Sequence, residues 1–174
     1  MTTLLIDGDI VAFQAAAATE VPVKWDDDLW TLHAYESEGQ ALIKKKLAAM
    51  LEQTGCVDFK FYLTGKENFR YDVLESYKGN RKDTRKPMTL KPLKQWMIDE
   101  YQAVLREPFE ADDLLGIRGS DGNDTIIASE DKDLKTVPCK FFNPAHPDEG
   151  VVTISEADAD LFFFTQVLTG DAVD

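Results

Sequence analysis

Short apolar segments alternate with longer amphipathic ones along this chain of 174 residues, and that alternation limits the possible folds most strongly. Two of the apolar segments are "LLID" at residues 4–7 and "TIIAS" at residues 125–129. Short, continuous runs of this kind are typical of strands buried on both faces, which occur mainly in parallel sheets. The segments between them have helical spacing and would cover such a sheet. We therefore expect a three-layer α/β/α domain with a mostly parallel central sheet.

The individual elements follow from periodicity and from turn residues. The stretch "WDDDLW" at residues 25–30 interrupts the pattern, and the aromatic residues of the last expected helix are predicted to pack inward. The expected strands cover residues 4–7, 58–65, 103–108, 124–130, 139–143 and 150–155. The expected helices cover residues 10–18, 41–51, 91–101, 110–119 and 155–168, with a helical turn at 133–137.

Carboxylates are concentrated where the expected strands end. Asp7 ends the first strand, Asp131 follows the strand around residue 127, and Glu110, Asp112 and Asp113 follow the segment at 103–108. Ligand sites of open α/β sheets lie at the carboxyl ends of the strands, so these side chains are expected at one edge. Two Mg²⁺ ions roughly 4 Å apart would relieve the repulsion between the carboxylates and could clamp a phosphodiester. Oxygen ligands without His or Cys suit Mg²⁺.

Each acidic cluster also has a simpler interpretation. Glu110, Asp112 and Asp113 would stabilise the first turn of a helix through its dipole, and Asp131 could cap the helical turn after it. Taken singly, each cluster is more often a cap than a catalytic group. The coincidence of all of them with strand ends favours a shared cation.

Charge is distributed unevenly along the chain. The formal net charge is −13, which argues against a generally nucleic-acid-binding surface. Residues 60–94, however, contain ten Lys or Arg against four Asp or Glu, a local balance of +6 that leaves −19 for the remainder. Such a chain could hold phosphate at one place and metal at another, although a solvated charged loop would have the same composition.

Several other classes of protein lack support in the sequence. There is no G-x-S-x-G elbow, no Walker loop, no signal peptide and no apolar run long enough to span a membrane. Cys56 and Cys139 do not form a C-x-x-C pair, which favours a reduced, cytoplasmic protein. His33 and His146 lie in polar or turn contexts and are expected at the surface.

Five segments in series resemble the flap-endonuclease-like 5′→3′ exonucleases, and within that family most closely the exonucleases of short-tailed phages. The segments are "LLIDGDIVAFQAAAA", "NFRYDVLESYKGNRK", "FEADDLLG", "IIASEDKDLKTVP" and "LTGDAVD", and they extend over nearly the whole chain. The resemblance implies a PIN-like, two-metal nuclease that acts on 5′ ends of duplex DNA and on RNA–DNA hybrids, as in primer removal. It also implies a phage protein, favoured as a monomer, in the cytoplasm of a bacterial host.

The same resemblance assigns roles to individual residues. Asp9, which lies two residues beyond Asp7, could share its face and compensate in part for a metal ligand that the chain lacks. Lys78 and Arg81 would lie at the base of an arch facing the scissile phosphate, with Arg70 as a second candidate for that role. A fixed ammonium or guanidinium group there would stabilise the transferring phosphoryl group. The Mg²⁺ or Mn²⁺ ligands would be Asp7, Glu110, Asp112 and Asp113 for the first ion, and Asp131, Asp133, Asp171 and Asp174 for the second. The nucleic-acid contacts would come from Tyr77, Lys78, Arg81, Lys82, Arg85 and Lys86.

The chain departs from the family pattern in two places. The family usually carries an aspartate at the end of the second strand, where this chain has Leu63, Thr64 and Gly65, so one ligand is missing. The motif "GDAVD" would open a helix–three-turn–helix module that holds duplex DNA with K⁺. We therefore expect a catalytic domain at 1–168 with a basic arch at 66–95, the start of a truncated module at 169–174, and weak activity in this form.

Two alternatives belong to other functional classes. "LLIDGDIV" fits the D-x-D-x-[TV] motif of haloacid-dehalogenase-type phosphatases, with Asp7 as the nucleophile, but this leaves "EADD" and "YKGNRK" without a role. An acidic interaction protein or DNA mimic would account for the charge of −13. A mimic, however, should spread its acids over an exposed face rather than beside apolar strand ends.

Overall fold

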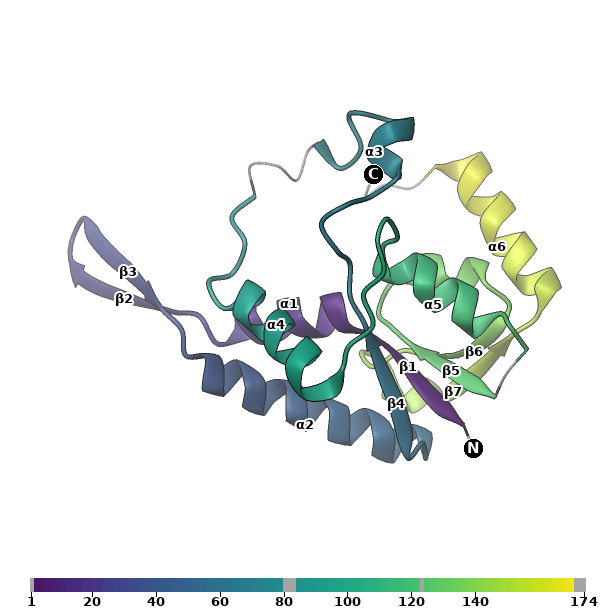
Figure 1. The fold of residues 1–174 in the computed structure, drawn as a ribbon, viewed down its shortest axis with the longest axis horizontal. Helices are drawn as coiled ribbons and strands as arrows, with labels where there is room; N and C mark the ends of the chain where they lie inside the picture. The colour runs from purple at the N-terminus through teal and green to yellow at the C-terminus, as the bar shows by residue number, and fades with distance from the viewer. Residues whose placement is uncertain (1, 80–83, 123, 171–174) are drawn as a thin grey trace.

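The computed structural model describes residues 2–79, 84–122 and 124–170. Its central sheet has the strand order β4-β1-β5-β6-β7, and every pairing is parallel except that of β7 with β6. The expected mostly parallel α/β architecture is therefore confirmed (Figure 1). The strands of this sheet are β1 (Thr3–Asp7), β4 (Asp58–Tyr62), β5 (Thr125–Ala128), β6 (Cys139–Phe142) and β7 (Val151–Ile154).

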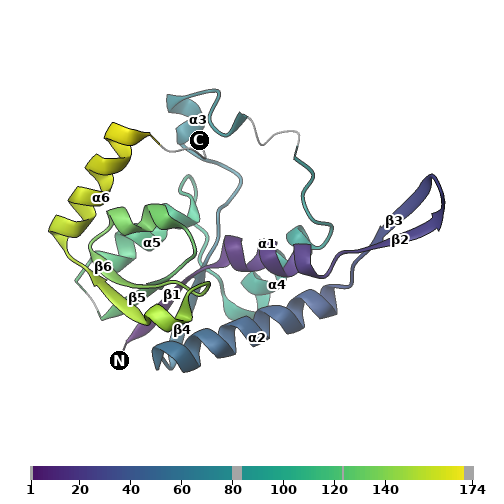
Figure 2. The same cartoon turned by 180° about the vertical axis from the view of Figure 1, so that it is seen from behind.

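Helices cover both faces of the sheet because successive residues of a buried strand point to opposite sides. In β1, Leu4 packs into one hydrophobic cluster with residues of α1, α2 and α4, whereas Leu5 packs into a second cluster with residues of α5. These two cores make the three layers visible from behind in Figure 2. The helices are α1 (Gly8–Ala18), α2 (Glu36–Thr54), α3 (Arg70–Val73), α4 (Leu90–Tyr101), α5 (Ala111–Gly119) and α6 (Glu156–Thr169).

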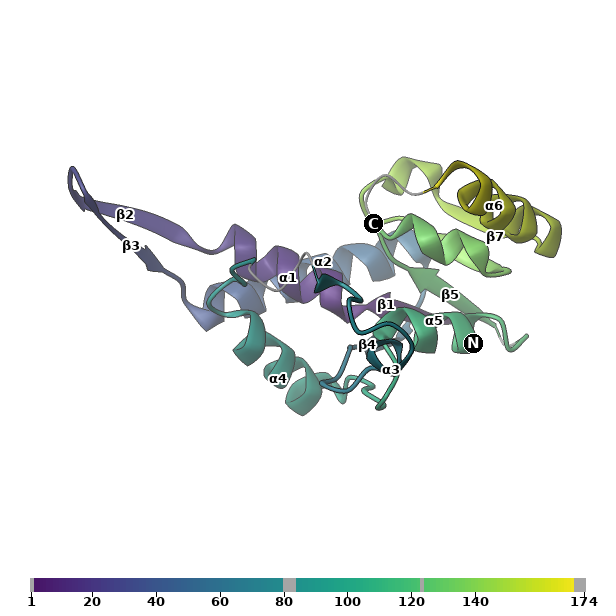
Figure 3. The ribbon, with the colours of Figure 1, turned by 90° about the horizontal axis from the view of Figure 1, so that it is seen from above.

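A β-hairpin that the sequence did not predict projects from the body of the molecule. It is formed by β2 (Val21–Asp26) and β3 (Leu29–His33), and the interrupting "WDDDLW" stretch makes its tip. Figures 1 and 2 show the hairpin reaching beyond the helices, and Figure 3 shows the same from above. Trp25 and Trp30 are 63% and 57% exposed. Hydrophobicity gave no sign of this hairpin because cross-strand pairing, rather than burial, holds it together.

Two expectations about individual segments are wrong. The strand expected at 103–108 is reduced to a single bridge between Val104 and Tyr62, because the chain turns soon after it, where the Phe109 amide donates to the carbonyl of Arg106. The aromatics of α6 do not all pack inward, because Phe163 and Phe164 are 50% and 58% exposed. Four consecutive apolar residues cannot all lie on one face of a helix with 3.6 residues per turn.

No helix in the described part of the chain combines the length and the apolar character needed to cross a bilayer. His33 and His146 are exposed, as expected. Cys56 and Cys139 are buried and unpaired.

Candidate active site

The first carboxylate of the site is Asp7, at the carboxyl end of the central strand β1. Gly8 follows it, and a Cβ there would lie 2.7 Å from the carbonyl oxygen of Tyr62, so only glycine allows α1 to start this close to β4. Asp7 is 3% exposed, and its Oδ1 caps α1 by accepting hydrogen bonds of 3.1 Å from the amides of Asp9 and Ile10. Burial raises the pKa of Asp7 to about 6, although the hydrogen bond from Ile10 opposes the shift.

Carboxylates at the ends of β1 and β5 and in the first turn of α5 influence one another at this edge of the sheet. Asp112, in the first turn of α5, has its pKa raised to about 7. Burial is the largest cause, followed by the negative charges of Asp7, Asp131 and Glu110. Asp7 lies more than a hundred residues before Asp112 and Asp131 in the sequence, and the structure brings the three carboxylates together. Their proximity leaves unbalanced negative charge in a partly desolvated place.

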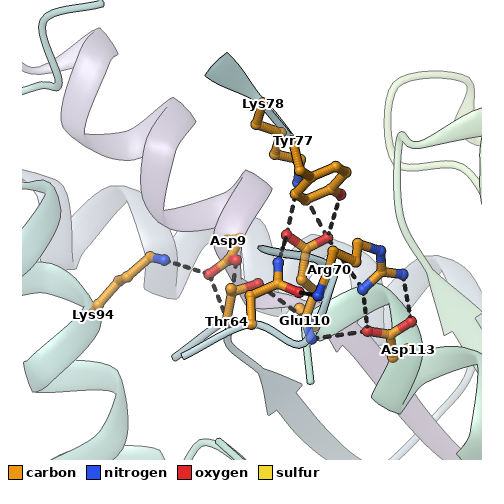
Figure 4. A network of polar contacts seen from close by, with 10 residues as sticks. Asp9, Thr64, Arg70, Tyr77, Lys78, Lys94, Glu110 and Asp113 are labelled. Atoms are coloured by element: carbon orange, nitrogen blue, oxygen red, sulfur yellow. Dashed lines mark hydrogen bonds and ion pairs between the residues drawn. The ribbon is translucent and has the colours of Figure 1, made fainter. Parts of the chain in front are cut away.

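Basic side chains of the segment before α4 contact two members of this cluster (Figure 4). Lys78 Nζ donates to both oxygens of Glu110, at 2.9 and 3.1 Å, and the Tyr77 hydroxyl donates to Glu110 Oε2 at 3.0 Å. Arg70 donates two hydrogen bonds of 2.7 Å to the two oxygens of Asp113. Among the described residues, three of the expected phosphate-facing or nucleic-acid-binding side chains thus lie against two of the expected metal ligands.

These contacts shift the proton affinities of the residues involved. Hydrogen bonding by Arg70 holds the pKa of Asp113 below its usual range, and Asp113 raises that of Arg70 further. Burial is the largest single influence on Lys78 and disfavours its charged form, but the hydrogen bond and negative charge of Glu110, together with the contact with Tyr77, outweigh burial and raise the pKa of Lys78. Lys78 also has a φ of 52°, in the left-handed region that is uncommon for a residue other than glycine. The backbone therefore adopts an unusual conformation where this ammonium group meets Glu110.

Some acidic residues of the site also cap the helix that follows them. Asp113 Oδ2 accepts a hydrogen bond of 2.9 Å from the amide of Glu110 at the start of α5. Asp131 Oδ1 accepts one of 2.8 Å from the amide of Asp133 at the start of the 3₁₀ helix η2 (Lys132–Thr136). The helix-capping interpretation of these residues is therefore correct, and the same side chains also surround a common region.

Two further residues of the site were not predicted. The Asn68 side chain donates to Glu110 Oε1 at 2.6 Å and accepts from the amide of Arg70. Thr64, in the stretch after β4 where the family resemblance led us to expect an aspartate, accepts a hydrogen bond of 2.9 Å from the amide of Ala111. A loop asparagine and a threonine carry no strong signal in a single sequence, because their partners lie more than forty residues away.

Asp9 lies beside the cluster and faces a different partner. Its carboxylate makes an ion pair of 2.6 Å with Lys94 of α4 and accepts from the amide of Thr64 (Figure 4). It thus joins α1 to β4 and α4. A supporting role of Asp9 for Asp7 in metal binding stays a prediction.

Other predicted residues lie at the margin of the site or outside the described part of the chain. Asp133 is exposed, and its Oδ1 accepts a hydrogen bond of 2.7 Å from Gln166 of α6. Arg85 pairs with Glu20 at 2.5 Å, whereas Lys86 is exposed to solvent. Arg81, Lys82, Asp171 and Asp174 lie outside the described residues.

The donor set fits a hard divalent cation. It consists of carboxylate oxygens, and the raised pKa values of Asp7 and Asp112 reflect the repulsion and desolvation that a bound cation would offset. Within residues 2–79, 84–122 and 124–170, no three acidic, His or Cys side chains are arranged as ready-made metal ligands. Glu110 and Asp113 are instead paired with Lys78 and Arg70.

Comparisons with known proteins identify the family of the chain. A family model described as "5′-3′ exonuclease, N-terminal resolvase-like domain" matches residues 2–143. The exodeoxyribonuclease of Enterobacteria phage T3 is 27% identical and the exonuclease of Escherichia phage T7 is 26% identical, each over 98% of this chain. The chain spans 60% of the length of each of these two relatives.

A solved structure has the same fold at low sequence identity. It is the bacteriophage T5 flap endonuclease in a pseudo-enzyme–product complex with DNA and metal ions, with a TM-score of 0.63 and 14% identity. The similarity covers 98% of this chain and 67% of that one.

Proposed function

Because the chain belongs to the 5′-3′ exonuclease N-terminal, resolvase-like domain family, we propose that it is a metal-dependent 5′→3′ exonuclease or flap endonuclease. Its substrates would be 5′ ends of duplex DNA or of RNA–DNA hybrids, as in primer removal. It would act in the cytoplasm of a phage-infected bacterium.

One observation carries the proposal. The charges of Asp7 and Asp131 act on Asp112 at a single edge of the sheet, and the neighbouring Glu110 and Asp113 pair with Lys78 and Arg70. Acidic side chains that hold cations, next to fixed positive groups that meet a phosphate, are the two components that phosphodiester hydrolysis requires. This juxtaposition supports a hydrolytic site better than any single motif does.

The acidic side chains of such a site would hold the cations. Asp7, Glu110, Asp112 and Asp131 would hold two Mg²⁺ or Mn²⁺ ions, with Asp113 and Asp133 beside them. Bound cations would supply positive charge to the phosphoryl oxygens of the scissile group.

The basic residues would exchange one anionic partner for another. Lys78 and Arg70 now neutralise Glu110 and Asp113, and a substrate phosphate would replace those carboxylates as their partner. Tyr77 and Lys86 would contact the nucleic-acid backbone nearby. The positive charges would then lie where negative charge develops in the transition state.

A digestion assay with 5′-labelled substrates tests the proposal. We expect the protein to release labelled products from duplex DNA, a 5′ flap or an RNA–DNA hybrid when Mg²⁺ or Mn²⁺ is present, and none when EDTA is added. The Asp131→Asn variant should be inactive, whereas Asp148→Asn, at an exposed position in η3 (Pro147–Glu149), should retain activity. Cleavage by Asp131→Asn at the wild-type rate would contradict the two-cation site.

Neither alternative function gains support from the site. A phosphatase of the haloacid dehalogenase type would use Asp7 as its nucleophile, but it would leave the pairing of Lys78 with Glu110 and of Arg70 with Asp113 without a role. A DNA mimic would need exposed acids, yet Glu110 is 7% exposed.

A further inference from the structure

The hydroxyl group of Ser129 connects two of the carboxylate positions. Ser129 directly follows β5 and is 2% exposed. Its Oγ donates a hydrogen bond of 2.9 Å to Asp7 Oδ2 and accepts one of 3.0 Å from the backbone amide of Asp131. A single hydroxyl therefore contacts both strand ends that contribute to the site.

The contact with Asp7 fixes the orientation of its carboxylate. Oδ1 accepts from the amides of Asp9 and Ile10, and Oδ2 accepts from Ser129. Because hydrogen bonds hold both oxygens, the plane of the carboxylate cannot rotate without breaking at least one of them. Oδ1 already accepts two hydrogen bonds, whereas Oδ2 accepts one and keeps its second lone pair available for a cation.

The contact with Asp131 fixes a backbone position rather than a side chain. The amide of Asp131 donates to Ser129, and the Asp131 carboxylate accepts from the amide of Asp133. These two hydrogen bonds hold the turn that follows β5. The parallel pairing of β1 with β5 brings the two strand ends together, and the hydroxyl links the Asp7 carboxylate to the backbone of Asp131.

A cavity beside Ser129 shows what this hydroxyl prevents. A cavity of about 120 Å³ is lined by Asp7, Ser129 and residues of α1 and α2. On its rim, Gln14 donates to Glu130 and accepts from Lys46, each at 2.7 Å. Without the hydrogen bond from Ser129, the Asp7 carboxylate would have space to turn away from the other acids.

We propose that Ser129 is a positioning residue that aligns Asp7 and Asp131 for divalent-cation binding. The inference rests on the proposed function, because it assumes that these two acids share a cation site. Partners of this kind, which hold metal ligands in place, commonly change metal affinity by about 10- to 100-fold. The sequence alone gave no sign of the role, although Ser129 lies two residues before Asp131 at the end of a buried strand.

Mn²⁺ binding measured by electron paramagnetic resonance tests this role without an activity assay. Ser129→Ala should weaken Mn²⁺ binding by about tenfold or more. Ser129→Thr keeps the hydroxyl, and the adjacent cavity has room for the added methyl group, so its affinity should stay within about threefold of the wild type. Ser129→Val has the shape of the threonine variant without the hydroxyl and should bind as weakly as Ser129→Ala.

Thr125 provides a matched control in the same strand. Its side chain is 4% exposed, and its buried Oγ1 has no hydrogen-bond partner among the described residues. Thr125→Val therefore removes a buried hydroxyl that touches no carboxylate and should leave Mn²⁺ affinity unchanged. Thermal unfolding in EDTA reports whether each variant folds, and the valine and threonine variants decide the question if Ser129→Ala does not fold.

The possible results separate the two hypotheses. If the wild type binds Mn²⁺ and the valine and threonine variants bind it equally well, the positioning role is wrong and the cation site stands. If the wild type binds no Mn²⁺, the proposed function itself fails, and the positioning role fails with it. Loss in the alanine and valine variants, with retention in the threonine variant, supports the positioning role.

Discussion

At the scale of single residues, Asp7, Asp113 and Asp131 each accept a backbone hydrogen bond at the start of a helix. A carboxylate in that position is stabilised by the helix dipole as well as by the hydrogen bond. This local stabilisation offsets part of the repulsion that arises when the same groups gather at the sheet edge. The fold can therefore hold an acidic cluster in the absence of a cation.

Replacing Asp112 by asparagine should remove part of that repulsion. Burial and the charges of Asp7 and Asp131 disfavour the ionised form of Asp112, so Asp112→Asn should raise the free energy of unfolding of the metal-free protein at pH 7.5. The expected gain is on the order of 1–3 kcal/mol. Urea denaturation in EDTA measures it, and added Mg²⁺ should stabilise the variant less than the wild type. A lower free energy of unfolding in EDTA would contradict this account.

Lys78 should act on the chemical step more than on substrate binding. Its ammonium group lies at the acidic cluster, where a transferring phosphoryl group would gain charge, so Lys78→Met should lower kcat by about 10²- to 10³-fold with a small change in KM. Lys45→Met on α2 is a control at an exposed position. Steady-state and single-turnover kinetics separate the two effects. A rise in KM with unchanged kcat would assign Lys78 to binding alone.

At the scale of elements, an ion pair joins the basic segment to the base of the hairpin. Glu20, immediately before β2, accepts hydrogen bonds from the Arg85 guanidinium and from the amide of Met88. These contacts attach the chain just before α4 to the end of α1. Arg85, which was expected to contact nucleic acid, therefore also has a structural partner in the free protein.

This ion pair predicts a specific pH dependence. Hydrogen bonding by Arg85, and then by the Met88 amide, lowers the pKa of Glu20 from 4.5 to about 2. A carboxyl group whose pKa is lowered by folding stabilises the folded state above its unfolded pKa, and the effect is lost as pH falls through the folded value. The difference in free energy of unfolding between wild type and Glu20→Gln should be constant above about pH 5.5 and shrink as pH falls toward 2. Urea denaturation across this range measures the difference. The same substitution in an Arg85→Ala background should show a much smaller pH dependence, and an equal one would contradict the pairing.

At the scale of the whole molecule, charge is separated between a basic segment and an acidic remainder. The net charge is −13, while residues 60–94 carry a local balance of +6. In Figures 1 and 2, α3 of this segment lies on the opposite side of the molecule from α2. Nucleic acid should therefore approach from the side of α3.

This separation predicts how DNA binding responds to salt. The logarithm of affinity should fall linearly with the logarithm of salt concentration, and its slope should become shallower by about one unit for each phosphate contact removed. Lys86→Gln should reduce the slope in this way, whereas Lys45→Gln on α2 should not. Fluorescence anisotropy with labelled duplex in Ca²⁺ at several salt concentrations measures both slopes. Equal reductions from the two substitutions would contradict binding through the basic segment.

The sequence by itself determined the layers of the fold and the positions of most acidic residues. Buried runs such as residues 4–7 and 125–128 specify parallel strands because nothing polar interrupts them. The carboxyl ends of parallel strands meet at one edge, so the residues that follow these runs had to lie close together. The local sequence pattern was sufficient here because buried strand positions require apolar residues.

The tertiary structure alone decided how those residues are held. The hydrogen bonds of Ser129 with Asp7 and of Asn68 with Glu110 join positions separated by 122 and 42 residues. Nothing in the local sequence indicates such a pair, because a serine or asparagine satisfies its hydrogen bonds equally well with water at the surface. The exposed hairpin and the exposed aromatics of α6 were missed for a related reason: hydrophobicity predicts which residues can be buried, and only packing decides which of them are.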